Sequence, residues 1–191
     1  MTKYYEENTQ KFIDETFGND VSFLYAMFEK HLKENVKILD IGFGSGRDSL
    51  YFQNRGYDVY SLDPVKAFCT HAKELGLKHI YHMSVQQMNF QNEFDGIWAC
   101  ASLLHIPSCE LNNVFNKCHD ALKDNGVMYC SFKYGEFEGE RNGRFFMDLT
   151  EERLSEYITE TKFKILEVVV TKDVRIDRNE RWLNVVLKKY I

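Results

Sequence analysis

Three glycines at alternate positions, Gly42, Gly44 and Gly46, most constrain what this chain can fold into. They stand in the segment ILDIGFGSGRDSLYF (38–52), between a short apolar run and an amphipathic stretch. Glycine permits positive φ angles and lets a ligand approach the backbone closely. The segment therefore predicts a buried strand, a tight turn and a helix. A tight turn that holds no ligand is the alternative interpretation of the same glycines.

The remainder of the chain continues this alternation of strands and helices. The spacing of apolar residues predicts two N-terminal helices, over 3–17 and 20–33. Five short strands follow, and two β-rich segments near the end of the chain are expected to form an antiparallel pair; the seven ranges are 36–42, 57–63, 78–83, 93–101, 126–134, 163–174 and 181–190. This order predicts an α/β fold with a mostly parallel sheet covered by helices on both faces.

Composition and charge narrow the class of protein. The 191 residues suffice for a single domain with a substantial core, and 24 Lys and Arg against 29 Asp and Glu give a formal charge of −5. We expect no basic face for nucleic acid, no membrane segment and no signal peptide, and therefore a cytoplasmic protein. The five cysteines form no CxxC pair, so they predict neither a metal site nor a disulfide framework.

The position of the glycine turn predicts a ligand and its class. In open α/β sheets, ligands bind beyond the carboxyl ends of the strands, usually at the first strand–helix turn. A dinucleotide fingerprint, G-x-G-x-x-G, needs glycine at position 47, where this chain has Arg47. A pyrophosphate, and with it a nicotinamide-dependent oxidoreductase, is therefore disfavoured. S-adenosylmethionine has no phosphate but still needs to approach the backbone, so it is the expected cofactor.

Two aspartates strengthen this prediction. Asp63 ends the second strand, where a carboxylate can accept hydrogen bonds from both ribose hydroxyls. Capping of the helix that Pro64 opens is the alternative role for Asp63. Asp40 comes just before the glycines, where it is expected to hold the loop amides or a ligand ammonium group, or only to brace the loop.

Later strand ends supply further cofactor candidates. Ser84 and Val85 follow the third strand, where a polar side chain and a backbone amide can read an adenine edge, although a plain connecting loop is the competing interpretation. Cys100 and Ala101 end the fourth strand, where small residues leave room for the methionine moiety.

Three segments together resemble the class I S-adenosylmethionine-dependent methyltransferases: LDIGFGSGRDSLYFQNRGYDVYSLD (39–63), FDGIWACASLLHIP (94–107) and LKDNGVMYCSF (122–132). The first is most similar to small bacterial enzymes of the tellurite-resistance type. The resemblance implies a Rossmann-like seven-stranded sheet in the order 3-2-1-4-5-7-6 with strand 7 antiparallel, and a cofactor core over 36–132. The cofactor-binding residues indicated in all are Tyr5, Asp40, Gly42, Gly44, Ser45, Gly46, Asp63, Ser84, Val85 and Cys100.

Regions outside that core are expected to bind the methyl acceptor. Tyr4 and Tyr5, in the N-terminal helical region 1–35, are expected to close over the cofactor as a lid, or else the helix only packs on the sheet edge. His105 follows the fourth strand and is the candidate general base, with packing or capping before Pro107 as the alternative.

A long loop over 133–150 is expected to supply the remaining contacts to the acceptor, before the last helix and hairpin edge at 151–191. Its candidate residues are Lys133, Tyr134, Arg141 and Arg144, because arginine can grip a carboxylate or an oxyanion bidentately. The alternative for the two arginines is pairing with Glu136, Glu138 or Glu140 on a solvated loop.

The sequence therefore predicts a methyltransferase that acts on a small molecule, with an anionic compound or a metalloid oxyanion among the candidates. A methyltransferase for nucleic acid or protein is the first alternative, but it would want a basic face, and the NPPY-type turn of amino-methylating nucleic-acid enzymes is replaced by ACASLL (99–104). A non-catalytic module that binds an adenosyl ligand is the second alternative. The residues do not indicate an oligomeric state.

Overall fold

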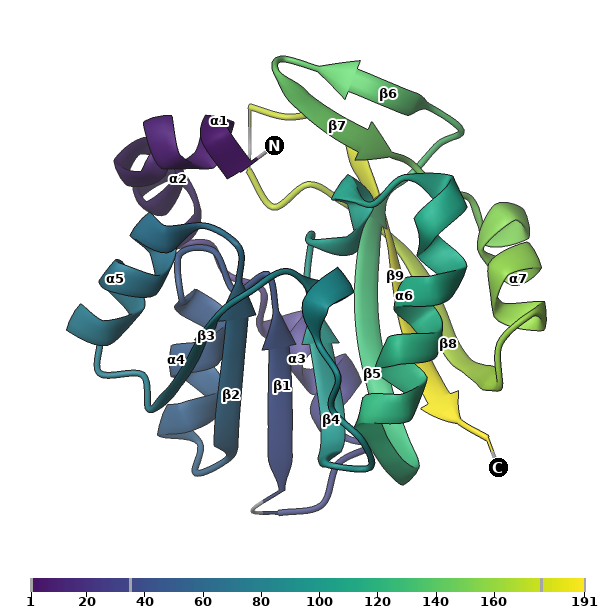
Figure 1. Ribbon diagram of the computed structural model, residues 1–191. Coiled ribbons are helices and arrows are strands. Elements are labelled where there is room, and N and C mark those ends of the chain that lie inside the picture. The colour runs from purple at the N-terminus through teal and green to yellow at the C-terminus, as the bar shows by residue number, and fades with distance from the viewer. Residues whose placement is uncertain (1, 35, 176, 191) are drawn as a thin grey trace.

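One seven-stranded sheet organises the molecule, in the order β3-β2-β1-β4-β5-β9-β8 (Figure 1). The structure is a computed structural model that describes residues 2–34, 36–175 and 177–190. The strands are β1 (Lys37–Ile41), β2 (Asp58–Asp63), β3 (His79–His82), β4 (Phe94–Ala99), β5 (Leu122–Lys133), β8 (Phe163–Lys172) and β9 (Arg181–Lys189). Strand β9 runs antiparallel to both of its neighbours, whereas β1 to β5 pair in parallel. The predicted α/β fold and its hairpin edge are confirmed.

The strand order is also the predicted one once a small second sheet is set aside. Strands β6 (Glu138–Arg141) and β7 (Arg144–Met147) pair only with each other, so β8 and β9 are the sixth and seventh strands of the main sheet. The expectation of a loop over 133–150 is therefore wrong, because these two strands form a hairpin around Asn142 and Gly143, which both have positive φ. Phe146 and Met147, at the end of β7, are buried, so this end of the hairpin packs against the core.

Helices cover both faces of the sheet because side chains alternate along each strand. On β4, Trp98 belongs to a core with α3 (Ser22–Glu29) and α4 (Arg47–Asn54), while its neighbour Ile97 belongs to a core with α6 (Ser108–Ala121) and α7 (Glu151–Thr159). Helix α5 (Lys66–Glu74) packs with α1 (Thr2–Glu7) and α2 (Thr9–Thr16) in a third cluster. No helix among the described residues is both long enough and apolar enough to cross a membrane.

The first predicted helix is in fact two. Helices α1 and α2 are separated at Asn8, whose side-chain amide donates to the carbonyl of Tyr4 at 2.8 Å. Such local hydrogen bonds offer the backbone an alternative to continuing a helix. The second predicted helix is shorter than 20–33, and the fifth strand begins at Leu122 rather than 126, with positive φ at Asn125 inside it. Thr150 caps α7, since its hydroxyl accepts a hydrogen bond from the amide of Arg153.

A buried carboxylate fixes the start of α4. Asp48 accepts hydrogen bonds from the Tyr25 hydroxyl at 2.6 Å and from the Trp98 indole at 2.9 Å, and Arg47 pairs with the same carboxylate at 2.6 Å. A buried charge is tolerated when it is paired and hydrogen-bonded in this way. The network anchors the helix that follows the glycine turn to both α3 and β4.

Candidate active site

The glycine turn lies at the carboxyl end of β1, where all three glycines have positive φ: +69° at Gly42, +53° at Gly44 and +80° at Gly46. A Cβ atom on Gly42 would lie 2.5 Å from Cβ of Ser102, and one on Gly44 would lie 2.9 Å from the ring of Phe12. Both conformation and space therefore require glycine here. The turn brings backbone amides close to the loops after β4 and the N-terminal helices.

Asp63 holds the turn from the end of β2. One carboxylate oxygen accepts from the amide of Gly44 at 3.0 Å, and the other accepts from the amide of Val65 at 2.8 Å. Burial raises the pKa of Asp63 to about 6, although these two backbone hydrogen bonds act in the opposite direction. Each carboxylate oxygen has a second lone pair, so both can still accept from a ligand.

Two cavities meet at this end of the sheet. The first, named the β2-side cavity, lies over the ends of β1 and β2 and is lined by Thr2, Tyr5, Phe12, Ile41, Gly42, Gly44, Leu62, Asp63, Pro64, Val65, Phe68, Ser84, Val85, Gln86, Ala101, Ser102, Leu103, His105 and Ile106. Its lining combines apolar side chains with one buried carboxylate. The predicted cofactor residues Asp63, Ser84 and Val85 are brought together here.

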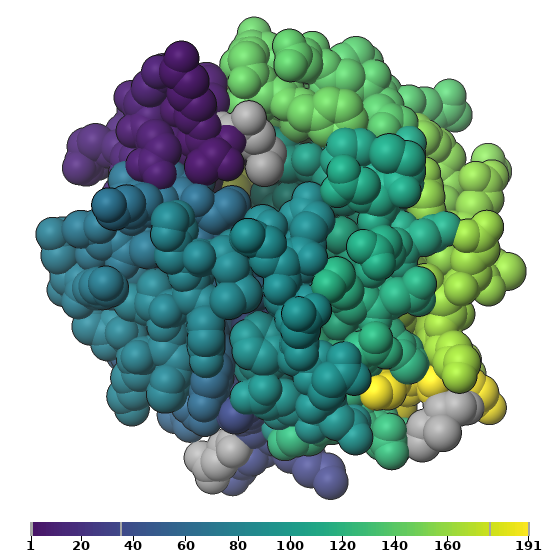
Figure 2. Space-filling view, in the orientation of Figure 1, coloured from purple at the N-terminus to yellow at the C-terminus, as the bar shows by residue number. Residues whose placement is uncertain are grey.

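The second, named the β5-side cavity, is lined by Tyr5, Phe12, Thr16, Asn19, Val21, Leu24, Gly42, Phe43, Gly44, Ser45, Arg47, Asp48, Cys100, Ala101, Leu104, His105, Ser131, Lys133, Arg144, Phe146, Thr171, Lys172, Asp173, Val174, Arg175, Arg178, Trp182 and Asn184. Six residues line both cavities and form the wall between them: Tyr5, Phe12, Gly42, Gly44, Ala101 and His105. In Figure 2 the purple N-terminal helices and the green β6–β7 hairpin lie over this end of the molecule.

Two predicted cofactor residues do not line either cavity. Asp40 is buried and accepts a hydrogen bond from the Ser49 hydroxyl at 2.6 Å, so its carboxylate braces α4 rather than holding the loop amides. Burial and the neighbouring Asp48 raise the pKa of Asp40 well above its usual range. Gly46 directs its missing Cβ towards Leu75, so it serves the turn itself.

Four residues form a closed hydrogen-bonded circuit at the wall. His105 Nδ1 lies 2.6 Å from the carbonyl oxygen of Phe145, which only accepts, so Nδ1 carries the proton. Nε2 then accepts from the Tyr5 hydroxyl at 2.9 Å, and the Tyr5 oxygen accepts from Arg144 Nη1 at 3.3 Å. Arg144 and Phe145 are adjacent in β7, so the circuit joins α1, the short 3-10 helix Leu103–His105 and the β6–β7 hairpin.

This environment sets the protonation state of the pair. Burial lowers the pKa of His105 to about 4, and the positive charge of Arg144 adds to that effect, while the bond to Phe145 acts against it. Burial likewise raises the pKa of Tyr5, partly offset by Arg144. At neutral pH the wall therefore presents a neutral imidazole and a neutral phenol. A pKa of about 4 makes His105 a weaker base than a free imidazole, so its role as general base stays a prediction; its side chain lines both cavities.

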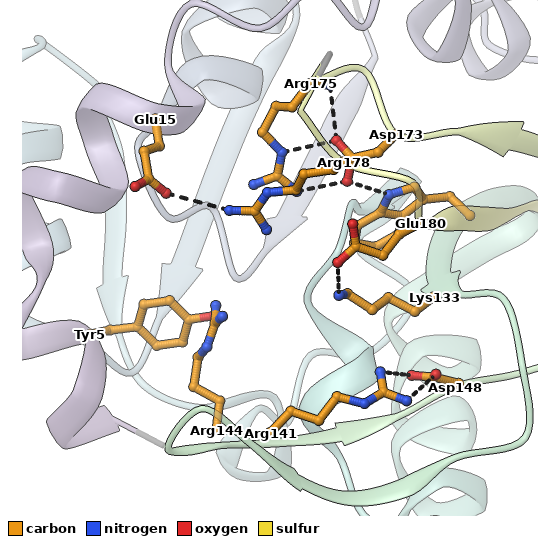
Figure 3. Close-up of polar contacts among 11 residues, drawn as sticks. Tyr5, Glu15, Lys133, Arg141, Arg144, Asp148, Asp173, Arg175, Arg178 and Glu180 are labelled. Carbon is orange, nitrogen blue, oxygen red and sulfur yellow. Dashed lines mark hydrogen bonds and ion pairs between the residues drawn. The ribbon is translucent and has the colours of Figure 1, made fainter.

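Cationic side chains gather around the β5-side cavity (Figure 3). Lys133 pairs with Glu180 at 2.8 Å, and Arg178 reaches Glu15 of α2 at 3.8 Å. A third pair joins Arg175 to Asp173 at 2.7 Å and holds the pKa of that carboxyl well below its usual range, against the effect of burial. The sequence did not indicate the cavity residues Asp173, Val174, Arg175 and Arg178, because the segment DVRIDRNE (173–180) predicts only a hairpin edge. Its alternating acids and bases were the signal available.

Two of the residues predicted to bind the methyl acceptor, Arg141 and Tyr134, do not line the β5-side cavity. Arg141 makes a two-pronged ion pair with Asp148, at 3.0 and 2.6 Å, and does not line the cavity; its partner is not one of the glutamates that were considered. Tyr134 lies under the guanidinium of Arg181, with 4.4 Å between guanidinium carbon and ring centroid. Successive strand residues point to opposite faces, which is why Lys133 enters the cavity and Tyr134 does not.

Three of the five cysteines are buried. Cys69, Cys118 and Cys130 are buried, Cys100 is half-buried at the β5-side cavity, and Cys109 is exposed on α6. Burial raises the pKa of Cys100 to about 12, so its thiol is protonated and serves as a small neutral wall residue. Phe43, within the glycine turn, is buried and also lines this cavity.

Residues 39–130 match the sequence model of a family described as "Methyltransferase domain". That range spans the glycine turn, Asp63, the loop after β3, all of β4 and most of β5. This match to a methyltransferase domain agrees with the class I S-adenosylmethionine-dependent methyltransferases that the sequence resembles. The cofactor of this family is S-adenosylmethionine, as the residues of the turn predicted.

Individual proteins similar to this methyltransferase domain include a phosphoethanolamine N-methyltransferase from Plasmodium falciparum, which is 29% identical over 157 residues. That alignment covers 75% of this chain and 58% of the Plasmodium protein, so the chain spans less than two thirds of that relative's length.

Solved structures share the fold. The 1,6-didemethyltoxoflavin-N1-methyltransferase of Burkholderia thailandensis superposes with a TM-score of 0.84 over 100% of this chain and 87% of that one, at 19% identity. TehB from Haemophilus influenzae gives 0.73 at 19% identity, over 89% and 62% respectively. At these identities the likeness concerns the fold, and it agrees with the class of methyltransferase that the sequence resembles.

The residues present fit this cofactor. The glycine turn leaves its side of the wall free of side-chain bulk, and the Asp63 carboxylate supplies acceptors suited to a ribose diol. The hydroxyl oxygen of Ser102 is buried beside Gly42 without a hydrogen-bond partner among the described residues, and it lines the same β2-side cavity. An unpaired buried hydroxyl is uncommon in proteins, which is consistent with a group meant to meet a ligand.

Proposed function

We propose that this protein transfers a methyl group from S-adenosylmethionine to a small-molecule acceptor bound in the β5-side cavity. The observation that carries the proposal is the pair of adjoining cavities with one shared wall. The β2-side cavity is lined by the predicted adenosine contacts, and the β5-side cavity adjoins it, bordered by α2, the β6–β7 hairpin and residues between β8 and β9. A cofactor and an acceptor can therefore meet at the wall.

The chain's own residues would hold the cofactor as follows. Asp63 would accept hydrogen bonds from the ribose, Ser84 and Val85 would contact the adenine edge, and Gly42 and Gly44 would allow close backbone approach. Bound S-adenosylmethionine supplies a methyl group on a positively charged sulfur, which departs with the bonding electron pair as a neutral thioether. The protein contributes position and exclusion of water.

Tyr5 and His105 would receive the proton that the acceptor loses. The Tyr5 oxygen has one lone pair engaged by Arg144 and a second free for an acceptor N–H or O–H. When the new bond to carbon forms, the acceptor proton passes to Tyr5, and the Tyr5 proton passes to Nε2 of His105. Because the pKa of His105 is about 4, its imidazolium then passes that proton to solvent water at neutral pH, which restores the neutral imidazole.

The borders of the acceptor chamber and the charge of the chain support a small molecule over a nucleic acid or a protein. The chamber is bounded on three sides by α1 and α2, the hairpin and the turn at 173–180, and the chain as a whole is acidic. The Plasmodium relative is named for a small acceptor, phosphoethanolamine, and the Burkholderia structure for another, 1,6-didemethyltoxoflavin. A metalloid oxyanion is the second candidate, favoured by the cations that surround the chamber and by the likeness to TehB.

Calorimetric titration tests the cofactor half of the proposal. We expect S-adenosylmethionine to bind in the micromolar range, NAD not to bind, and Asp63→Ala to weaken the former. A panel of acceptors, including phosphoethanolamine, small aromatic nitrogen heterocycles and tellurite, then tests the transfer by release of S-adenosylhomocysteine. Tight binding of the cofactor with no release on any acceptor would favour the non-catalytic adenosyl-binding module instead.

A further inference from the structure

We infer that the methyl acceptor carries a carboxylate and that Arg144 binds it. This inference rests on the proposed function and names the class of its substrate. It follows from a comparison of the charged side chains around the β5-side cavity, and it does not depend on any relative. Five half-buried cations line that cavity: Arg47, Lys133, Arg144, Arg175 and Arg178.

Four of these five cations already have an acidic partner. Arg47 pairs with Asp48, Lys133 with Glu180, Arg175 with Asp173 and Arg178 with Glu15. Arg144 has no carboxylate within 4.0 Å among the residues that the structure describes. Lys172 also borders the cavity, but it is exposed and its charge is screened by water. The half-buried part of the chamber thus has one uncompensated positive charge.

The hydrogen bonds of Arg144 are incomplete as well. Nη1 donates to the Tyr5 hydroxyl, while the Nε atom is buried and has no acceptor among the described residues. A buried guanidinium donor without a partner is costly, and an anion would satisfy both its charge and its geometry. Arg144 therefore lacks the anionic partner of an ion pair, and a bound ligand would supply that anion.

The surroundings of the guanidinium select a flat anion. Its central carbon lies 4.8 Å from the ring centroid of Tyr4 and 5.0 Å from that of Phe146, so aromatic rings flank it. Because the rings flank the guanidinium, its N–H groups along the edge of the plane are left for a ligand. Their arrangement matches the two coplanar oxygens of a carboxylate. A phosphate dianion would bring two negative charges to a site with one unpaired positive charge. We therefore commit to a carboxylate.

The position of Arg144 links recognition to reaction. The same residue donates to Tyr5, which lies on the wall shared with the cofactor cavity. A carboxylate held at Arg144 would thus place the rest of the acceptor against the Tyr5 hydroxyl, at the proposed point of transfer. The acceptor's reacting nitrogen or oxygen and its carboxylate would be separate groups of one molecule.

The test is a binding titration with simple probes on the protein saturated with S-adenosylhomocysteine, repeated on the cofactor-free protein. The probes are acetate, benzoate, the neutral benzamide and inorganic phosphate, at constant ionic strength. We expect benzoate to bind about tenfold or more tightly than benzamide and more tightly than phosphate, because only a carboxylate matches both charge and shape. Acetate should bind more weakly than benzoate, because apolar side chains also line the chamber.

Three variants complete the experiment. Arg144→Gln should weaken benzoate about tenfold or more, and Arg144→Lys should also weaken it, because it keeps the charge but loses the fork. Arg178→Gln, which removes a cation already paired with Glu15, should change benzoate affinity by less than about threefold. Retained affinity for S-adenosylhomocysteine shows that each variant is folded.

The inference is overturned if neither acetate nor benzoate binds the wild-type protein, if phosphate binds more tightly, or if Arg144→Gln leaves benzoate affinity unchanged. It is also overturned if Arg178→Gln weakens benzoate binding as much as Arg144→Gln does. Such a result would show that benzoate responds to the overall positive charge of the cavity and not to Arg144 in particular. Failure of S-adenosylhomocysteine to bind would instead remove the proposed function, and the cofactor-free titration would still decide on the carboxylate.

Discussion

The hydroxyl of Tyr5 lies 2.9 Å from Nε2 of His105, although the two residues are 100 positions apart in the chain. The contact joins the first helix to the loop that follows the fourth strand. Because His105 donates its other nitrogen to the carbonyl of Phe145, the direction of each proton in the contact is fixed. Substitutions at Tyr5, Asp63, Gly42 and Asp48 test this site and the residues that hold it in place.

Tyr5→Phe should lower the turnover number by about 100-fold, since it removes the group proposed to receive the acceptor proton while keeping the aromatic ring. The KM for S-adenosylmethionine should change by less than about threefold, because the phenyl ring still closes the wall. Tyr4→Phe is the matched control: Tyr4 neighbours Tyr5 in α1 but lines neither cavity. Equal losses in the two variants would show that the phenol of Tyr5 has no special role.

Cofactor affinity should rise with pH through about 6, because burial raises the pKa of Asp63 to that value and its ionised form is the better acceptor for the ribose. The stability of the cofactor-free protein responds in the opposite sense. A carboxyl whose folded pKa lies above its unfolded value of 3.8 contributes stability at low pH that is lost as pH rises to about 6.

Asp63→Asn should abolish both of these pH dependences and weaken the cofactor by about 10- to 100-fold, since a charged acceptor is replaced by an amide that cannot accept at both positions. Calorimetry between pH 5 and pH 8 and urea unfolding over the same range measure the two effects. A cofactor affinity that stays flat with pH in the wild type would contradict the assignment.

Gly42→Ala should destabilise the fold more than Gly76→Ala, although both glycines have positive φ. At Gly76 the new Cβ meets nothing within 4 Å, so only backbone strain of about 1–2 kcal/mol is expected. At Gly42 the Cβ would lie 2.5 Å from Cβ of Ser102, which adds roughly 1–3 kcal/mol of overpacking. Urea denaturation of the two variants measures the difference, and equal costs would mean that the loop after β4 can simply move away.

Asp48→Ala should cost about 3–5 kcal/mol in unfolding free energy, because it leaves the charge of Arg47 unpaired and two buried donors, on Tyr25 and Trp98, without an acceptor. Asp48→Asn keeps the shape and one acceptor, so its cost should be smaller. Asp14→Asn, at an exposed carboxylate of α2, should change stability by less than about 0.5 kcal/mol. A small effect of Asp48→Ala would show that water can enter and solvate Arg47.

The sheet was largely predictable because its strands are short, apolar and separated by glycine turns, so that the period of the pattern identifies them. The helix boundaries were less predictable than the strands. Nothing in the spacing of apolar residues marks the break between α1 and α2 at Asn8, because that break depends on a local side-chain hydrogen bond. The hairpin at 138–147 was also missed, since its outer residues are charged and its pairing is stabilised by contacts with distant segments.

One part of the candidate site could be predicted from the sequence and the other part could not. Asp63 and the glycines belong to one continuous motif, so their proximity follows from the turn itself. The acceptor chamber is built from α1, α2, β5, β7 and the turn at 173–180, and no local pattern says that Glu15 faces Arg178 or that Tyr5 faces His105. The sequence leaves the role of Asp40 open between a ligand contact and bracing, because its burial beneath the turn depends on Ser49, a partner contributed by the following helix.

The six-residue wall has a consequence for how such proteins diversify. A replacement at Phe12 or Ala101 alters both chambers at once, so a change of acceptor made there would disturb the methyl donor as well. Thr171, Trp182 and Asn184 border the acceptor chamber alone, from the far edge of the sheet. New acceptor preferences can thus arise along β8 and β9 while the donor half of the enzyme stays the same.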